Sequence, residues 1–141
     1  MIFLLFLIFS PRILVAQKST MDMVKAAKQE IENLVPEKVM AELAKGNVVL
    51  IDIREPEELK QAGKISGAVN APRGMLEFYA DSSLPYHKPE FDKVKRLILY
   101  CASSGRSALA VKTLKEMGYK NVAHIDGGFK AWKAAGMPVA E

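Results

Sequence analysis

The sequence contains very little cysteine: Cys101 is the only one in 141 residues, and there are only two histidines. A single cysteine cannot form an intramolecular disulfide, so the thiol is free. No Cys/His cluster has the spacing of metal ligands. The sequence also lacks a phosphate-binding glycine loop, a dinucleotide fingerprint and an internal repeat. These absences exclude the common motifs for metals, nucleotides and repeat architectures.

A strong charge of either sign is also lacking. The formal net charge is +4, and the lysines are scattered along the chain. Scattered lysines are typical of a solvated surface, so no nucleic-acid partner is predicted. The length fits one domain, and 50% hydrophobic residues are enough for a sizeable core.

The N-terminus has an apolar run that is too short for a membrane span. Residues 1–9 and 13–16 are apolar but are separated by Pro11 and Arg12, whereas a spanning helix needs about 20 residues. No integral membrane span is therefore predicted. Two interpretations of residues 1–20 stay open. They form a signal or membrane-proximal segment, which implies export to the periplasm, or they are a spurious extension before a true start at Met21 or Met23, which implies a cytoplasmic protein.

Helical and strand patterns alternate through the rest of the chain. An amphipathic pattern predicts an N-terminal helix over 21–33, reaching Leu34, before a domain over 34–141. Apolar runs predict strands at 48–52, 68–70, 96–100 and 122–125. Periodicity and Gly or Pro boundaries predict helices at 37–45, 55–61, 74–79, 107–117 and 128–135. This order indicates an α/β fold with a parallel sheet covered by helices on both faces, and ligands of such sheets bind at the carboxyl ends of the strands.

Cys101 follows the strand at 96–100 and precedes the helix at 107–117. The short turn between them should direct free backbone amides, and the positive end of the helix dipole, toward the sulfur. Such surroundings favour the reactive thiolate over the thiol.

Four segments together resemble the rhodanese-like sulfurtransferases. Residues 52–58 (DIREPEE) resemble the Asp-x-Arg turn of that family, and residues 63–72 (GKISGAVNAP) resemble its Gly-His-Ile-x-Gly-Ala segment. Residues 100–107 (YCASSGRS) resemble the active-site loop, and residues 127–132 (GGFKAW) resemble the C-terminal Gly-Gly-x-x-x-Trp. The resemblance runs from about Leu34 to Val139. It implies a three-layer domain with a central parallel sheet of about five strands.

The resemblance also implies a rhodanese-type (thiosulfate) sulfurtransferase. Cys101 would take a sulfane sulfur from thiosulfate, a polysulfide or a persulfide, and would pass it to cyanide or a thiol. This chemistry needs no metal and no organic cofactor, and a donor or acceptor protein is a further possible partner. Cys101 is the predicted catalytic residue. The predicted substrate-binding residues are the rest of its loop, together with an arginine after the third strand: Ala102, Ser103, Ser104, Gly105, Arg106, Ser107 and Arg73. Asp52 and Arg54 are predicted to form a structural hydrogen-bonded turn near the site.

Two positions depart from the family pattern. Lys64 stands where histidine is usual, at a mainly structural position. Ser104 stands where the family loop has glycine, so a positive φ at this position would strain the backbone.

Two other functions stay open. Cysteine phosphatases have five residues between the cysteine and the arginine, whereas four separate Cys101 from Arg106, a smaller loop that suits a single sulfur atom. A binding or regulatory module without turnover is the other alternative, although such modules usually lack the cysteine. His124, in an apolar strand, is interpreted as a packed core residue, and so is Trp132.

Overall fold

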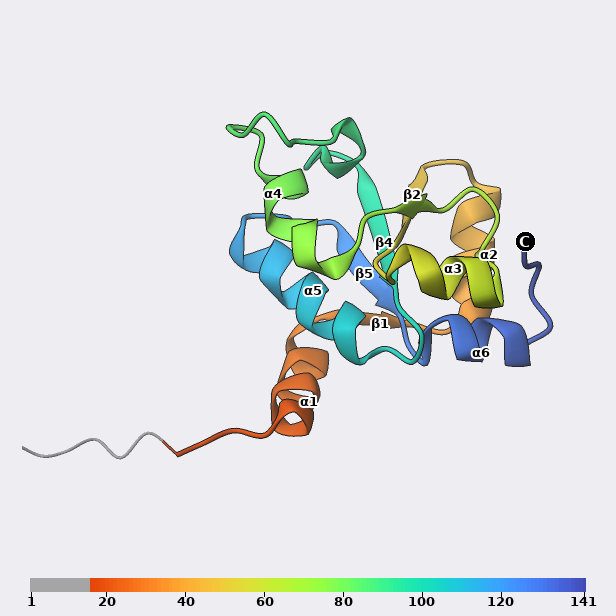
Figure 1. Cartoon of the computed structure of the whole chain (residues 1–141), viewed down its shortest axis with the longest axis horizontal. Coiled ribbons are helices and arrows are strands. Elements are labelled where there is room, and N and C mark those ends of the chain that lie inside the picture. Colours follow the sequence, from red (N-terminus) through yellow and green to blue (C-terminus); the bar gives the residue numbers. More distant parts are fainter. Residues whose placement is uncertain (1–15) are drawn as a thin grey trace, which may run out of the picture.

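The computed structural model describes residues 16–141, in which one five-stranded parallel sheet lies between two layers of helices (Figure 1). The strand order is β1-β5-β4-β2-β3, so β4 is the central strand. The strands are β1 (Glu32–Leu34), β2 (Val48–Asp52), β3 (Val69–Asn70), β4 (Arg96–Tyr100) and β5 (Val122–Ile125). The predicted α/β class and three-layer arrangement are confirmed.

The helices complete the layers. They are α1 (Thr20–Glu30), α2 (Pro36–Ala44), α3 (Pro56–Ala62), α4 (Leu76–Ala80), α5 (Gly105–Glu116) and α6 (Gly128–Ala134), with short 3-10 turns η1 (Arg73–Met75) and η2 (Pro89–Phe91). Most of these bounds lie within two residues of the predicted ones.

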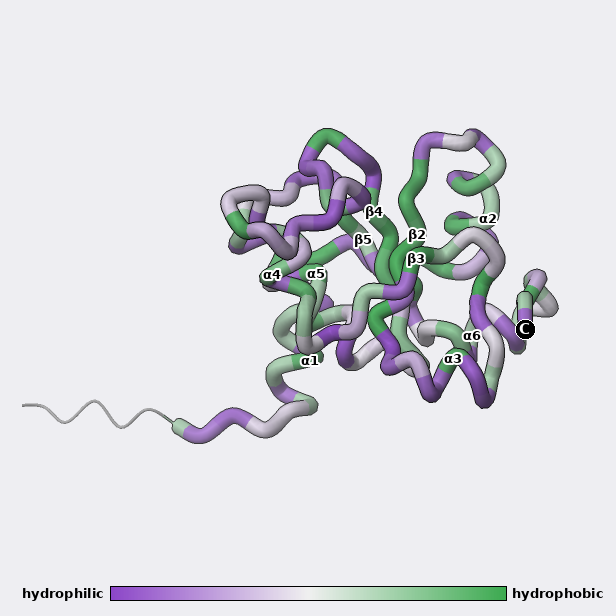
Figure 2. Tube along the Cα trace, turned by 45° about the horizontal axis from the view of Figure 1, so that its top comes forward, coloured by the Kyte–Doolittle hydropathy of each residue, from purple (hydrophilic) through white to green (hydrophobic). Residues whose placement is uncertain are grey.

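Side-chain alternation along β4 divides the core between the two faces of the sheet. Leu97 and Leu99 pack with α4 and α5, whereas Ile98 and Tyr100 pack with α2 and α6. The strand is therefore apolar on both sides, and the hydropathy colours show β2 and β4 as a green centre under more polar surface segments (Figure 2). Trp132 is fully buried in the second cluster, as predicted.

The predicted N-terminal helix extends too far. Helix α1 ends at Glu30, and Glu32–Leu34 instead pair with β5 as the edge strand β1. The Asn33 side-chain amide donates to the carbonyl oxygens of Lys28 and Ile31, at 2.8 and 3.1 Å. These bonds occupy carbonyl groups near the helix end, where a short polar side chain competes with continued helix.

The alternatives for residues 1–20 fall largely outside the described residues, which begin at 16. Within residues 16–141, no helix is both long and apolar enough to cross a membrane.

Candidate active site

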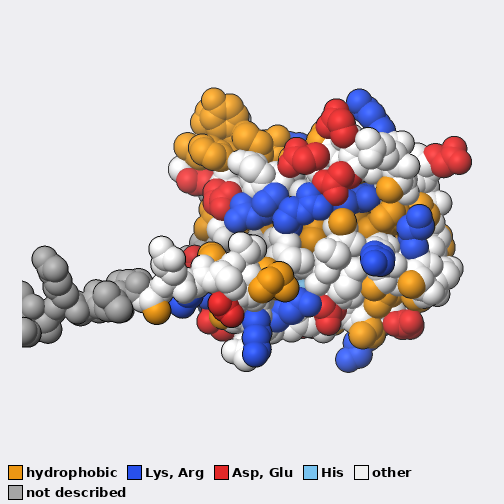
Figure 3. Space-filling model, turned by 60° about the horizontal axis from the view of Figure 1, so that its bottom comes forward, with side chains coloured by type: hydrophobic (Ala, Val, Ile, Leu, Met, Phe, Trp, Pro, Cys, Tyr) orange, Lys and Arg blue, Asp and Glu red, His pale blue; other side chains and the backbone are white. Residues whose placement is uncertain are grey.

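The carboxyl ends of the central strands β2 and β4 lie side by side, and each continues into a turn. Asp52 is opposite Tyr100 in the register, and the Ile53 amide donates to the Tyr100 carbonyl at 3.0 Å. In Figure 1 the loop after β4 lies at the lower end of the molecule, between β4 and α5. The view from that end shows basic, acidic and apolar side chains intermixed (Figure 3).

Cys101 lies at the base of this loop with its side chain almost fully buried. Its Sγ accepts hydrogen bonds from the backbone amides of Ser104 and Ser107, at 3.2 and 3.4 Å. The Ser107 hydroxyl lies 3.6 Å from Sγ. The residue itself is 1% exposed. Two N–H donors directed at one sulfur favour a negative charge on it.

Ser104, which stands where the family loop has glycine, adopts the left-handed backbone conformation. Its φ is 91°, and it is the sole non-glycine residue with positive φ in the part of the chain that the structure describes. Ser104 is also the N-cap of α5, so the helix begins two residues earlier than predicted. The left-handed turn directs the Ser104 amide back at the sulfur, and the strain is the local cost of that geometry.

Two backbone hydrogen bonds connect helix α6 to the cysteine loop. The amides of Phe129 and Lys130 donate to the carbonyls of Cys101 and Ala102, at 2.8 and 3.0 Å. The approach is so close that a Cβ at Gly128 would lie 2.5 Å from the Cys101 oxygen. Gly128, the second glycine of the Gly-Gly pair found in the sequence, therefore permits α6 to pack against the cysteine loop.

The Arg106 side chain is held by an acidic residue of α3. Its guanidinium makes a bidentate ion pair with Glu58 of α3, at 2.7 and 2.8 Å. This hydrogen bonding lowers the pKa of Glu58 to about 2 and raises the pKa of Arg106 above its ordinary value. The pair ties α5 to α3, and Glu58 is a site-shaping residue that the sequence analysis did not select.

Arg73 lies in a different cavity from the one beside the loop. It pairs with Glu77 at 3.0 Å and lies 3.4 Å from the Thr113 hydroxyl. The cavity of about 350 Å³ that it lines is formed by α1 and α5 residues, including Lys112. The structure does not bring Arg73 together with the residues of the Cys101 loop around one cavity.

Asp52 and Arg54 form the hydrogen-bonded turn after β2. The Asp52 carboxylate accepts from the Arg54 amide at 3.0 Å and from its guanidinium at 2.7 Å. Arg54 also donates to the Gly63 carbonyl at 2.8 Å and lies 4.2 Å from the centre of the Phe129 ring. Both side chains are buried, so this turn supports the wall of the site.

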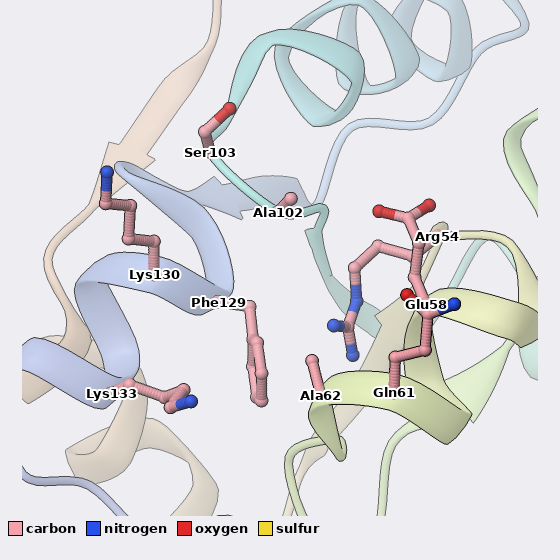
Figure 4. Close-up of a pocket in the computed structure, with 9 residues that line it drawn as sticks. All are labelled: Arg54, Glu58, Gln61, Ala62, Ala102, Ser103, Phe129, Lys130 and Lys133. Carbon is pink, nitrogen blue, oxygen red and sulfur yellow. The ribbon is translucent and has the colours of Figure 1, made fainter.

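A cavity of about 380 Å³ opens beside the loop, between α3 and α6 (Figure 4). Ala102 and Ser103 of the loop line it, together with Ala62 and the Phe129 ring. The exposed Lys130 and Lys133 of α6 lie at its edge. Arg54, Glu58 and Gln61 complete the lining, so the cavity combines an apolar wall with three cationic side chains and one carboxylate, next to the cysteine turn.

His124 is packed, as expected, but it is also hydrogen-bonded toward the cysteine. Its Nδ1 lies 2.9 Å from the Ser107 hydroxyl, and its Nε2 lies 2.7 Å from the Asn33 side-chain oxygen. Burial lowers the pKa of His124 to about 4. No sequence pattern indicated Asn33. The signal available for His124 was a polar ring in an apolar strand, because a buried polar ring must find hydrogen-bond partners.

No group of three or more potential metal-ligating side chains occurs within residues 16–141. The described site consists of the buried Cys101 thiol, two amide donors and the Ser107 hydroxyl, with a cavity beside it.

Comparisons with known proteins agree with this geometry. The rhodanese-like domain family matches residues 35–135. A thiosulfate:glutathione sulfurtransferase of Saccharomyces cerevisiae is 36% identical over 95 residues, which cover 64% of this chain and 68% of the yeast protein.

Two solved structures are similar over most of the chain. A Rhodopseudomonas palustris protein of unknown function, described as a possible tyrosine phosphatase, is 43% identical with a TM-score of 0.83, covering 89% of this chain and 96% of the other. A polysulfide-sulfur transferase homodimer of Wolinella succinogenes is 34% identical with a TM-score of 0.67, covering 83% of each chain. The matched region spans 48% of the length of a Synechocystis protein and 63% of the length of a putative mitochondrial thiosulfate sulfurtransferase of Schizosaccharomyces pombe.

Proposed function

Because the chain belongs to the rhodanese-like domain family, we propose that it is a sulfurtransferase that carries a sulfane sulfur as a persulfide on Cys101. The observation that carries the proposal is the Cys101 sulfur itself, buried at the carboxyl end of β4 and facing two backbone N–H donors. These donors stabilise an anionic sulfur before and after transfer.

The reaction has two displacement steps. In the first, the Cys101 thiolate attacks the outer sulfur of a donor such as thiosulfate. The donor S–S bond breaks, sulfite leaves with the electron pair, and a Cys101 persulfide forms. In the second, an acceptor nucleophile such as cyanide or a thiolate attacks the outer sulfur, and the Cys101 thiolate is regenerated.

The cavity beside the loop is the proposed donor site. Lys130 and Lys133 at its edge would attract an anionic donor, and the Phe129 wall would exclude water. The names of the yeast and Wolinella relatives support thiosulfate, polysulfide and a small thiol as substrates. The loop residues Ala102 to Gly105 and Ser107 remain the proposed binders of the transferred sulfur, whereas Arg106 acts through its ion pair with Glu58.

Intact mass spectrometry tests the proposal directly. After incubation with thiosulfate, a polysulfide or glutathione persulfide, the protein should gain about 32 Da, the mass of one sulfur atom bound covalently. Cyanide should remove this mass and release thiocyanate. Cys101→Ser should gain no mass with any donor. A wild-type protein that stays unmodified with the whole panel would instead favour a binding module without turnover.

A cysteine phosphatase is a second candidate, because of the description of the Rhodopseudomonas palustris protein. Two observations weigh against it: four residues separate Cys101 from Arg106, and Glu58 holds the guanidinium that would otherwise bind phosphate oxygens. An aryl phosphate assay separates the two functions. Efficient Cys101-dependent turnover of the phosphate, without persulfide formation, would overturn the sulfurtransferase proposal.

A further inference from the structure

The sealed position of Cys101 raises the question of where its thiol proton goes. Of the three groups that the structure places in hydrogen-bond contact with Sγ, two are backbone N–H donors, which cannot accept a proton. The third is the Ser107 hydroxyl at 3.6 Å. Among the described residues, Ser107 Oγ is therefore the contact through which a proton can leave the sulfur.

The Asn33 side chain fixes the proton positions on the histidine beyond Ser107. Its amide nitrogen donates to two carbonyl oxygens, those of Lys28 and Ile31. The side-chain oxygen must then face His124, so Nε2 of His124 carries a proton and donates it to Asn33. In the neutral ring, Nδ1 is left with a lone pair directed at the Ser107 hydroxyl, 2.9 Å away.

Charged groups around His124 are few and partly compensated. Asp126 favours a proton on the ring and Lys28 of α1 opposes it, and these two groups pair with each other at 2.7 Å. On β1, Glu32 is engaged by Arg96. Because burial lowers its pKa to about 4, His124 is neutral near pH 7, and a proton taken up at Nδ1 is stabilised by the thiolate charge that the same transfer creates.

We propose that Ser107, His124 and Asn33 form a proton relay that takes the thiol proton of Cys101 when the nucleophile is generated. The S–H bond of Cys101 breaks and its proton moves to Ser107 Oγ, while the Ser107 hydroxyl proton moves to His124 Nδ1. The electron pair stays on Sγ, and nothing is oxidised or reduced. The product is a thiolate whose charge balances the imidazolium one hydroxyl away.

The relay crosses three parts of the fold. Ser107 lies in the first turn of α5, His124 is on β5, and Asn33 is on the edge strand β1, opposite His124 in the register. Ser107 and His124 are fully buried, whereas Asn33 is exposed. Asn33 also precedes residues 35–135, which match the family. Ser107 touches the reacting sulfur, and His124 and Asn33 act through it as positioning residues.

A competing hydrogen bond sets a limit on the relay. Ser107 Oγ also lies 3.1 Å from the Ser104 carbonyl, longer than its 2.9 Å contact with His124. A hydroxyl with a single proton can donate to one of them at a time. The relay is connected when the hydroxyl faces His124.

The test is the pH dependence of Cys101 alkylation by iodoacetamide, which requires no sulfur donor. The inference rests on the proposed sulfurtransferase function for its meaning, but this measurement does not, so the two can fail separately. In the full chain, Ser107→Ala and His124→Asn should each move the alkylation midpoint upward by about one pH unit, which slows alkylation about tenfold below the midpoint. Ser107→Ala keeps the backbone amide that bonds to the sulfur.

Matched controls remove the same groups elsewhere. Thr113→Val deletes a hydroxyl further along α5, and His87→Asn replaces the other histidine, in the loop between α4 and η2. Both should leave the alkylation midpoint in place. Far-ultraviolet circular dichroism of each variant identifies any that fail to fold.

Nitrogen-15 NMR of the histidine rings gives an independent reading in the wild-type protein. In the neutral ring near pH 7, His124 should carry its proton on Nε2, which leaves the Nδ1 lone pair facing the Ser107 hydroxyl. The proposal is overturned if the midpoint stays fixed or falls in both relay variants, or if the neutral ring of His124 carries its proton on Nδ1.

Discussion

Two neighbouring turns at the same edge of the sheet use their polar groups in opposite ways. After β2, the Asp52 carboxylate is met by the backbone and guanidinium of Arg54, which also binds the Gly63 carbonyl. After β4, the Cys101 sulfur is met by two backbone amides. The Asp52 charge is thus balanced by Arg54 within the first turn. The two amides of the second turn can stabilise a negative charge, which forms on the sulfur when Cys101 loses its proton.

This difference separates support from reactivity. A turn closed by a buried ion pair is rigid because its charged groups find partners within the turn itself. A turn built from amides around a sulfur holds a reacting atom with backbone donors in place of a bonded side-chain cation. The Glu58–Arg106 pair joins the two, because Glu58 lies on the helix after the first turn and Arg106 on the helix after the second.

The largest expected effect comes from breaking the supporting turn. Arg54→Ala leaves the fully buried Asp52 carboxylate without its partner, and removing one member of such a pair costs about 3–5 kcal/mol of unfolding free energy. Urea denaturation measures the loss. Lys60→Ala, on an exposed α3 pair at 3.8 Å, should change stability by less than about 0.5 kcal/mol. If the two variants proved equally stable, the β2 turn would not be the rigid support described above.

His124, which is hydrogen-bonded to Ser107 of the reactive turn, should make the stability of the protein depend on pH. The folded pKa of about 4 lies below the ordinary value of 6.5. As pH falls below 6.5, the unfolded chain therefore takes up the proton first, and stability is lost until about pH 4. The loss amounts to about 3 kcal/mol.

The measurement compares wild type with His124→Asn by denaturation at several pH values. The variant has no titrating ring at this position, so the stability difference between the two proteins should change steadily between pH 6.5 and 4 and stay constant above pH 7.5. A difference that is constant over the whole range would contradict the buried, neutral state of His124.

Helix α6 supports the reactive turn, and Gly128→Ala should disturb it. The new Cβ would lie 2.5 Å from the Cys101 carbonyl oxygen, so the loop and helix must separate at a cost of about 1–3 kcal/mol. Persulfide formation by intact mass should slow at the same time. Gly136 also has a positive φ, but a Cβ there would meet no atom within 4 Å. Gly136→Ala should therefore lower the unfolding free energy by about 1 kcal/mol and leave persulfide formation unchanged. Equal persulfide rates in the two variants would mean that α6 does not hold the loop in place.

The two turns were not equally predictable from sequence. Strands 96–100 and 122–125 were predicted to the residue, because continuous apolar runs with polar ends define them. The strained conformation at Ser104 followed from a serine in place of glycine. These features depend on local sequence, and local sequence is what periodicity and turn chemistry describe.

Long-range partners account for what was missed. Asn33 and His124 are 91 positions apart, and Glu58 and Arg106 are 48 apart. Strand β1 has three residues, and the apolar Leu34 together with the preceding Ile31 fits a helical period as well as an edge strand, so the pairing with β5 decides the structure of this segment. Such contacts form only when the sheet brings distant segments together, so residue spacing along the sequence does not predict them.

The smallest expected effect is a gain in stability at Ser104, whose left-handed backbone conformation is strained and directs its amide at the sulfur. Ser104→Gly removes the side chain from a φ of 91°, which should add about 1 kcal/mol to the unfolding free energy and raise Tm by about 4 °C. The Ser104 backbone amide remains, so the sulfur keeps both donors and the persulfide should still form. Ser103→Gly, a neighbour without positive φ, should bring no such gain because glycine there only adds freedom to the unfolded chain. If Ser104→Gly left Tm unchanged, the left-handed turn would not be the strained element of the pair, and the stability of the reactive turn would have to come from its contacts with α6.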